Sequence, residues 1–213
     1  MTEPASGLSE IAHALRSRRE VDSRVAEATL TVKREDFVQE NDRGRATCDR
    51  ALSIGKGQTI SQPSLVAHMI SELGLEPGVA RVLDVGCGSG YQAAILSLLA
   101  NQVVTVERIG ELADAARYRL KRLGYENVEV VEASDEVLGC PERAPYDAII
   151  VGASAPEVPQ SLVDQLKPHG RMVIPVGTRR RQRVATVVKT DEGCNVSYGV
   201  ECVFVPLIGP QAW

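Results

Sequence analysis

A short strand followed at once by a glycine-rich turn is predicted from Val82-Leu83-Asp84-Val85-Gly86-Cys87-Gly88-Ser89-Gly90-Tyr91. The apolar start is typical of a buried strand, and three glycines at alternate positions indicate a tight turn before a helix. Because glycine has no Cβ, a ligand can lie against the backbone there, and the first turn of the helix offers unpaired N–H groups. The stretch therefore predicts a small-molecule site beyond the end of this strand.

The spacing of the glycines favours one class of ligand. The dinucleotide fingerprint GxGxxG needs its third glycine where this chain has Tyr91, and a large side chain there would obstruct close packing of the helix on the strand. The spacing GxGxG, with Asp84 two residues before the first glycine, suits a ligand without a pyrophosphate, such as S-adenosylmethionine. A tight turn that binds no ligand is the alternative.

A carboxylate at the end of the next expected strand supports that ligand. The strand expected at residues 103–107 ends in Glu107, seventeen positions after Gly90. In a doubly wound sheet, ligands bind beyond the carboxyl ends of the strands, so this acid is placed to bind both hydroxyls of a ribose. A solvent-exposed glutamate at the start of a helix over residues 109–123 is the alternative.

Strands and helices alternate along most of the chain. The strands are expected at residues 81–85, 103–107, 128–132, 146–151 and 171–176, and the helices at residues 91–100, 109–123 and after Pro159. This alternation predicts right-handed βαβ units with helices on both faces. Two last strands, at 183–189 and 197–205, have no helix between them and are expected to form a C-terminal antiparallel hairpin. The fold class is therefore α/β, with a doubly wound, mostly parallel seven-stranded sheet.

The first part of the chain is expected to contain N-terminal helices and no strand. A helix is expected at residues 25–32, a polar surface loop at residues 41–50, and a further helix from Pro63, since proline is favoured in a first helical turn. We divide the chain into a helical extension with its loop, residues 1–57, and a main domain, residues 58–213, which together form one compact unit.

Composition excludes several classes of protein. The chain has 213 residues, 44% of them hydrophobic, which is enough for one full core, and its net charge of −4 argues against a nucleic-acid partner. The five cysteines form no CxxC pair, so we expect no metal site and a reducing compartment. No apolar run approaches the roughly 20 residues of a membrane span, and no secretory signal is expected. We expect a cytoplasmic monomer that binds neither nucleic acid nor membrane.

Several segments together are similar to one family. They are residues 57–63, which read Gly-Gln-Thr-Ile-Ser-Gln-Pro, and residues 82–92, 103–108, 144–151, 166–168 and 173–177. These segments closely resemble protein-L-isoaspartate O-methyltransferases, which have the Rossmann-like fold of class I methyltransferases. The glycine turn and the acid after it belong to that class at large, whereas Gln-Thr-Ile-Ser-Gln-Pro is specific to the family. The resemblance covers the chain from about residue 25 to its C-terminus.

The resemblance implies an activity and a substrate. It implies transfer of a methyl group from the cofactor S-adenosylmethionine to the free α-carboxylate of L-isoaspartyl residues in peptides and proteins, which begins the repair of damaged proteins. Two alternatives stay open. One is a related carboxyl methyltransferase that acts on a dedicated peptide or a small-molecule carboxylate, and the other is a module that binds the ligand without catalysis.

The resemblance also implies roles for individual residues. Ser61 is expected to donate a hydrogen bond to the incoming carboxylate, although it could instead cap the helix that begins at Pro63. The expected cofactor-binding residues are Asp84, Gly86, Cys87, Gly88, Gly90, Glu107, Arg108, Ser134 and Asp135. The expected substrate and lid residues are Gln58, Thr59, Ile60, Gln62, Pro63, Ser64 and Leu207.

The chain departs from the family at two places. It has Ala133-Ser134-Asp135 where the family usually carries Gly-Asp-Gly near the adenine, so Asp135 is only a candidate for that contact. It has Ser64 where a tyrosine or histidine is usual. Outside the motifs, His68 could face the site or be packed elsewhere, and the arginines at 179–183 could bind an acidic peptide or RNA or form a solvated loop.

Overall fold

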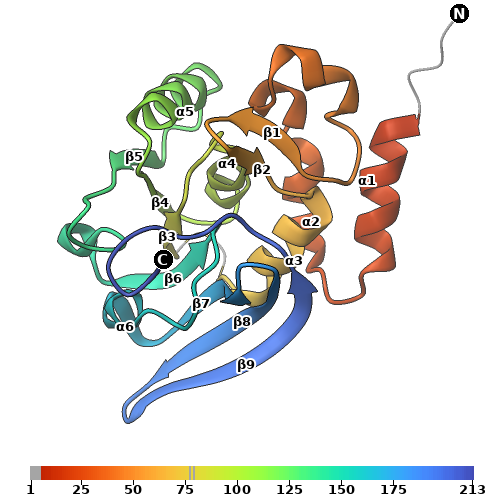
Figure 1. The fold of residues 1–213 in the computed structure, drawn as a ribbon. Coiled ribbons are helices and arrows are strands. Elements are labelled where there is room, and N and C mark those ends of the chain that lie inside the picture. The colour runs from red at the N-terminus through yellow and green to blue at the C-terminus, as the bar shows by residue number, and fades with distance from the viewer. Residues whose placement is uncertain (1–5, 77, 79) are drawn as a thin grey trace, which may run out of the picture.

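A seven-stranded sheet forms the centre of the protein (Figure 1). It is seen in a computed structural model that describes residues 6–213 except 77 and 79. The strands are β3 (Arg81–Val85), β4 (Gln102–Glu107), β5 (Val128–Glu132), β6 (Tyr146–Val151), β7 (Leu166–Thr178), β8 (Arg181–Thr190) and β9 (Gly193–Cys202). Their order is β5-β4-β3-β6-β7-β8-β9. The first five of these are parallel, and β8 runs antiparallel to both of its neighbours, which confirms the predicted fold class and the C-terminal hairpin.

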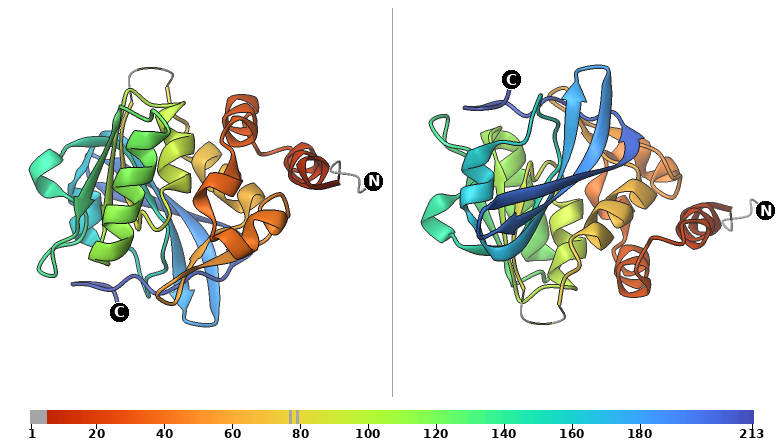
Figure 2. Two further views of the ribbon diagram at one scale, coloured as in Figure 1. Left: turned by 90° about the horizontal axis from the view of Figure 1, so that it is seen from above. Right: turned by 90° about the horizontal axis from the view of Figure 1, so that it is seen from below.

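Helices cover both faces of the sheet. They are α1 (Ser6–Ser17), α2 (Ser23–Thr31), α3 (Pro63–Glu72), α4 (Tyr91–Ser97), α5 (Gly110–Arg122) and α6 (Gln160–Asp164), with short 3-10 helices at Arg34–Phe37, Glu40–Arg45 and Pro141–Arg143. Alternate strand residues enter opposite cores. Val82 belongs to the core that includes residues of α1 to α5, and Leu83 belongs to the core that includes residues of α6. Figure 2 shows α1 at the outer edge of the molecule.

Several element boundaries differ from the predictions. The helix expected at 91–100 ends at Ser97. Strand β7 begins at Leu166, earlier than expected, because Leu166 pairs with Tyr146. An irregularity follows this pair, and His169 within it has a φ angle of +63°. The turn between the last two strands is shorter than expected, since their pairing continues to Thr190 and Gly193. The last strand ends at Cys202, before the expected end at residue 205. Half of the expected surface loop at 41–50 lies in the 3-10 helix that ends at Arg45.

A second, two-stranded sheet was not predicted. Strand β1 (Leu52–Gly55) pairs antiparallel with β2 (Gln58–Ile60) through a turn in which Gly55, Lys56 and Gly57 all have positive φ. Such short strands carry too few residues for an alternating pattern to be recognised. The hairpin contains residues on both sides of the expected boundary at 57/58, and the division into two parts stays a prediction.

Two absences hold for the part of the chain that the structure describes. None of its helices is both long and apolar enough to cross a membrane. None of its His, Cys, Asp and Glu side chains gather in groups of three or more that could hold a metal ion.

Candidate active site

The glycine turn lies at the carboxyl end of β3 and forms part of a cavity of about 310 Å³. Gly86 and Gly88 line this cavity with φ angles of +95° and +53°, values that side chains rarely allow. Gly90 does not line the cavity; a Cβ there would lie 3.2 Å from the side chain of Leu120. The first two glycines therefore expose backbone to a ligand, and the third lets α5 pack closely on the turn.

Glu107 faces the cavity from the end of β4, as expected. Its side chain is buried, one carboxylate oxygen accepts a hydrogen bond from Gly88 N at 2.8 Å, and the other accepts one from Ile109 N at 2.9 Å. The acid is therefore held against the glycine turn and at the start of α5 at once. Its carboxylate is fixed in place before any ligand binds.

Asp84 does not line the cavity. It is fully buried beneath the turn, where its carboxylate accepts hydrogen bonds from Thr105 Oγ1 and Gln92 Nε2, both at 2.7 Å. Burial raises the pKa of Asp84 to about 7, against the lowering effect of these two hydrogen bonds, and the charge of Glu107 raises it further. The structure thus places Asp84 as a support beneath the turn.

Cys87 is also buried, outside the cavity lining. Burial, together with the negative charge of Asp84, raises the pKa of the Cys87 thiol far above its usual range. A thiol that stays protonated is a poor nucleophile, so the structure gives Cys87 a packing role.

The far wall of the cavity comes from the loop after β5 and from the ends of β6 and of the chain. Arg108, after β4, and Ser134 line the cavity as expected, whereas Asp135 does not. Sequence reasoning missed the following lining residues: Val85, Val106, Ile109, Ala133, Val137, Leu138, Gly139, Gly152, Ala153, Val205, Pro206 and Ile208. The apolar pair Val137-Leu138 in an otherwise polar loop was the available signal.

Buried amide side chains hold this wall in place. Gln165 accepts a hydrogen bond from Cys140 N at 2.9 Å and donates one to Leu138 O at 2.8 Å. Gln182 accepts one from Phe204 N at 2.7 Å, which fixes the C-terminal segment before it reaches the cavity. Leu207, expected at the substrate, is buried and lines the cavity.

The β1–β2 hairpin lies against the glycine turn and contains the first three of the expected lid residues. A Cβ added to Gly88 would lie 3.2 Å from Cδ1 of Ile54, and Lys56 Nζ lies 2.7 Å from the carboxylate of Glu111 on α5. Gln58 and Thr59 of β2 line the cavity, and Ile60 is buried outside its lining.

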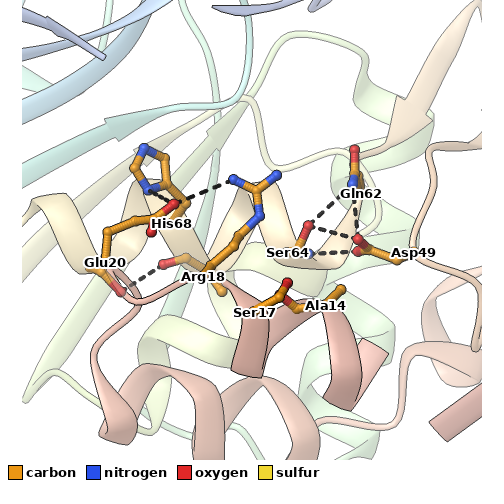
Figure 3. A network of polar contacts seen from close by, with 10 residues as sticks. Ala14, Ser17, Arg18, Glu20, Asp49, Gln62, Ser64 and His68 are labelled. Carbon is orange, nitrogen blue, oxygen red and sulfur yellow. Dashed lines mark hydrogen bonds and ion pairs between the residues drawn. The ribbon is translucent and has the colours of Figure 1, made fainter. Parts of the chain in front are cut away.

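The residues after β2 do not line the cavity. Gln62, and not Ser61, is the N-cap residue of α3, and Pro63 begins the helix. Gln62 and the buried Ser64 both bind the carboxylate of Asp49 (Figure 3). Ser61 is half-buried, and within the described residues its hydroxyl has no hydrogen-bond partner, so it is free to bind another molecule.

The remaining candidates lie elsewhere. His68 is buried in α3 with Nδ1 4.0 Å from the carboxylate of Glu20, away from the cavity lining, so the packed alternative is confirmed (Figure 3). Arg179 and Arg180 form an exposed turn between β7 and β8, and Arg181 pairs with Glu201 at 2.8 Å.

Comparison with known proteins identifies the family. The family described as protein-L-isoaspartate(D-aspartate) O-methyltransferase matches residues 7–212. A protein-L-isoaspartate O-methyltransferase of Methanopyrus kandleri is 50% identical over 196 residues, which cover 90% of this chain and 86% of that protein. The protein of the same name from Geobacter metallireducens is 48% identical over 198 residues, which cover 92% and 91%.

Solved structures agree with this result. A structure of a protein-L-isoaspartate O-methyltransferase matches with a TM-score of 0.86 and 32% identity, and covers 96% of this chain and 67% of that one. A structure described as the Plasmodium falciparum enzyme in complex with S-adenosyl-L-homocysteine matches with a TM-score of 0.80 and 28% identity, and covers 93% and 96%. The chain belongs to the protein-L-isoaspartate O-methyltransferase family.

Proposed function

We propose that this chain transfers a methyl group from S-adenosylmethionine to the free α-carboxylate of L-isoaspartyl residues in peptides and proteins. The observation that carries the proposal is a single cavity whose lining includes two sets of residues. We assign the glycine turn and Glu107 to the cofactor and call them the cofactor end. We assign Gln58, Thr59 and Leu207, with Ser61 just after β2, to the substrate and call them the substrate end. Family membership and the ligand of the Plasmodium falciparum structure support the same activity.

The residues at the cofactor end fit S-adenosylmethionine. Gly86 and Gly88 have no Cβ, so a ligand can lie against their backbone in the cavity. The fixed carboxylate of Glu107 can accept hydrogen bonds from ribose hydroxyls. Val137 and Leu138 offer apolar surface for the flat face of a base. Ser134 is the polar residue of that loop that lines the cavity, and it replaces Asp135 as our candidate for the adenine end.

Little acid–base chemistry is needed from the protein. The bound cofactor supplies a methyl group on a positively charged sulfur. An isoaspartyl α-carboxylate has an ordinary pKa of about 4, so it is already ionised at neutral pH. The chain has to orient this carboxylate, which we assign to the Ser61 hydroxyl, and to exclude water, which we assign to the β1–β2 lid.

The test is transfer of labelled methyl to a synthetic isoaspartyl peptide and to its aspartyl twin. We expect label only in the isoaspartyl peptide, and we expect base treatment to release it as methanol because methyl esters hydrolyse readily. Label in both peptides would favour the related carboxyl methyltransferase. Cofactor binding without any methanol would favour a module without catalysis.

Expectations about location and partners accompany the proposal. All five cysteines are free, which suits the reducing conditions of a cytoplasm. A monomeric state, and the exclusion of nucleic acid and membranes as partners, stay predictions.

A further inference from the structure

Arg34 is a deeply buried arginine that joins segments far apart in the sequence. Its side chain belongs to the 3-10 helix after α2, and the residue is only 4% exposed. Nη1 donates hydrogen bonds to the carbonyls of Ala46 and Cys48, at 3.1 and 3.0 Å. Nη2 donates to the carbonyl of Arg50 at 2.7 Å and to that of Ser61 at 3.1 Å. One guanidinium therefore ties the loop at residues 46–50 to the residue that we expect to orient the substrate.

Asp49 of the same loop binds two residues that follow Ser61, Gln62 and Ser64. Its Oδ1 accepts a hydrogen bond from Ser64 N at 2.8 Å, and its Oδ2 accepts from Ser64 Oγ at 2.7 Å and from Gln62 Nε2 at 2.9 Å. Figure 3 shows these contacts at the start of α3. Asp49 therefore caps α3 from outside the helix, a task usually done by the residue just before it.

The two sets of contacts fix Ser61 between them. Its carbonyl is bound on one side, and the peptide that follows leads directly into a capped helix that begins with Pro63. The Arg34 guanidinium also lies 5.9 Å from the ring centroid of Tyr91, the first residue of α4 after the glycine turn. The contacts therefore link Ser61 to the helix that follows the glycine turn as well as to its own helix.

We infer that Arg34 and Asp49 are positioning residues that hold the Ser61 hydroxyl in the direction needed to bind the substrate carboxylate. The inference rests on the proposed function. Arg34 binds backbone carbonyls, including that of Ser61, and Asp49 binds Gln62 and Ser64, so each acts on the segment around Ser61 and not by touching the substrate. A hydrogen bond to substrate contributes most when its donor is already oriented, because no freedom is then lost on binding.

The first experiment is a double-mutant cycle with Arg34→Lys and Ser61→Ala. Lysine keeps the positive charge, but a single ammonium group cannot reach both sets of carbonyl oxygens. We expect Arg34→Lys to lower kcat/KM for an isoaspartyl peptide about 10- to 30-fold, and to cost less than about threefold when Ser61 is already alanine. Equal losses in both backgrounds, or full activity of Arg34→Lys, would overturn the inference.

A matched control separates this effect from the general loss of an arginine. Arg183 also donates to two backbone carbonyls, those of Tyr198 and Gly199, and lies 5.9 Å from the ring of Tyr198. It belongs to β8 and does not line the cavity. We expect Arg183→Lys to leave kcat/KM within about twofold of wild type, and an equal loss in both arginine variants would contradict a specific role for Arg34.

Asp49→Asn provides a second variant in case Arg34→Lys folds poorly. Asparagine can still accept the hydrogen bond of Ser64 N, but its amide nitrogen cannot accept those of the hydroxyl and of Gln62. We expect a loss in kcat/KM of about five- to tenfold that again disappears in the Ser61→Ala background. The affinity for S-adenosylhomocysteine, measured by calorimetry, should stay within about threefold, and a larger change would assign Asp49 to cofactor binding.

Hydrogen exchange tests the inference without relying on activity. If the bonds from Arg34 and Asp49 hold this segment, the amides of residues 59–65 should exchange at least about fivefold faster in both variants, while those of β8 stay unchanged. Unchanged exchange at residues 59–65 would overturn the inference even in an active enzyme. If wild type failed to methylate the isoaspartyl peptide, the proposed function would fail, and faster exchange would still support the bracing of Ser61.

Discussion

The two ends of the cavity are held by different kinds of contact. At the cofactor end, the carboxylate of Glu107 binds Gly88 N and Ile109 N. These three residues lie at the ends of the adjacent strands β3 and β4 or just after them. At the proposed substrate end, Ser61 lies just outside the cavity lining and is held by Arg34, 27 positions earlier in the chain, and through a helix start bound to Asp49. The cofactor end therefore depends on one strand pair, and the substrate end depends on a segment outside the main sheet.

Glu107→Ala should have the largest effect, and it should act at the cofactor end alone. The change removes the expected ribose contacts and leaves Gly88 N without its acceptor, so the turn loses its preorganised shape. We expect the affinity for S-adenosylhomocysteine, measured by calorimetry, to fall about 100-fold, which corresponds to about 2.7 kcal/mol.

An exposed glutamate provides the control for this change. Glu126 lies after α5 and outside the cavity lining, so Glu126→Ala should leave the affinity unchanged. An unchanged affinity in Glu107→Ala as well would refute the ribose assignment and remove the main support for a cofactor end.

The same contrast explains which parts of the site could be predicted from sequence. The glycine turn and Glu107 are encoded by a local pattern, because a parallel strand order brings neighbouring strand ends together. The contacts of Arg34 and Asp49 have no such pattern, since a buried arginine bound to carbonyls looks like any other charged residue in a polar segment. The hairpin at residues 52–60 was missed for a related reason, because its strands are too short to show a period.

The strands of the large sheet were predictable, and their ends were less so. Their apolar runs are long enough to recognise, but the length of β9 depends on how far it pairs with β8. This pairing extends to Thr190 and Gly193. The lining residues Val137 and Leu138 lie in a loop whose path depends on Gln165, about 27 residues later. Such contacts are set by tertiary structure, which a single sequence does not reveal.

Ser61→Ala should have the next largest effect, confined to the substrate end. Removal of the hydroxyl leaves the backbone contact with Arg34 intact, so the variant loses only the orienting hydrogen bond. We expect kcat/KM for an isoaspartyl peptide to fall about 10- to 100-fold, with little change in cofactor affinity. Ser97→Ala, which removes a hydroxyl bound to Ala94 O within α4, should leave kcat/KM unchanged. Wild-type turnover in Ser61→Ala would remove this residue from the mechanism.

Asp84→Asn should produce a smaller change that depends on pH. The pKa of Asp84 is raised to about 7 from 3.8, so between these values the folded state binds a proton that the unfolded state has lost. The free energy of unfolding of wild type should therefore fall as pH rises from 5 to 7, and then become independent of this group.

Asparagine cannot ionise, but it can keep a hydrogen bond to Gln92 and one to Thr105. Between pH 5 and pH 8, we expect the free energy of unfolding of wild type, measured in urea, to fall by at least about 1 kcal/mol relative to that of Asp84→Asn. Parallel curves for the two proteins would show that Asp84 is ionised throughout, and that the support beneath the turn is a charged one.

Lys56→Ala should have the smallest effect, because it removes only an exposed contact of the lid. Lys56 and Glu111 keep 47% and 74% of their side-chain surfaces exposed, and such pairs contribute roughly 0 to 1 kcal/mol. We expect the free energy of unfolding to change by less than about 0.5 kcal/mol. The release of S-adenosylhomocysteine should become about twofold faster. In 0.5 M salt, which screens the ion pair, wild type and variant should release it at the same rate. Glu111→Ala should behave alike, and the double variant should be no worse than either single one. A tenfold effect would mean that the ion pair between Lys56 and Glu111 is what holds the hairpin against α5.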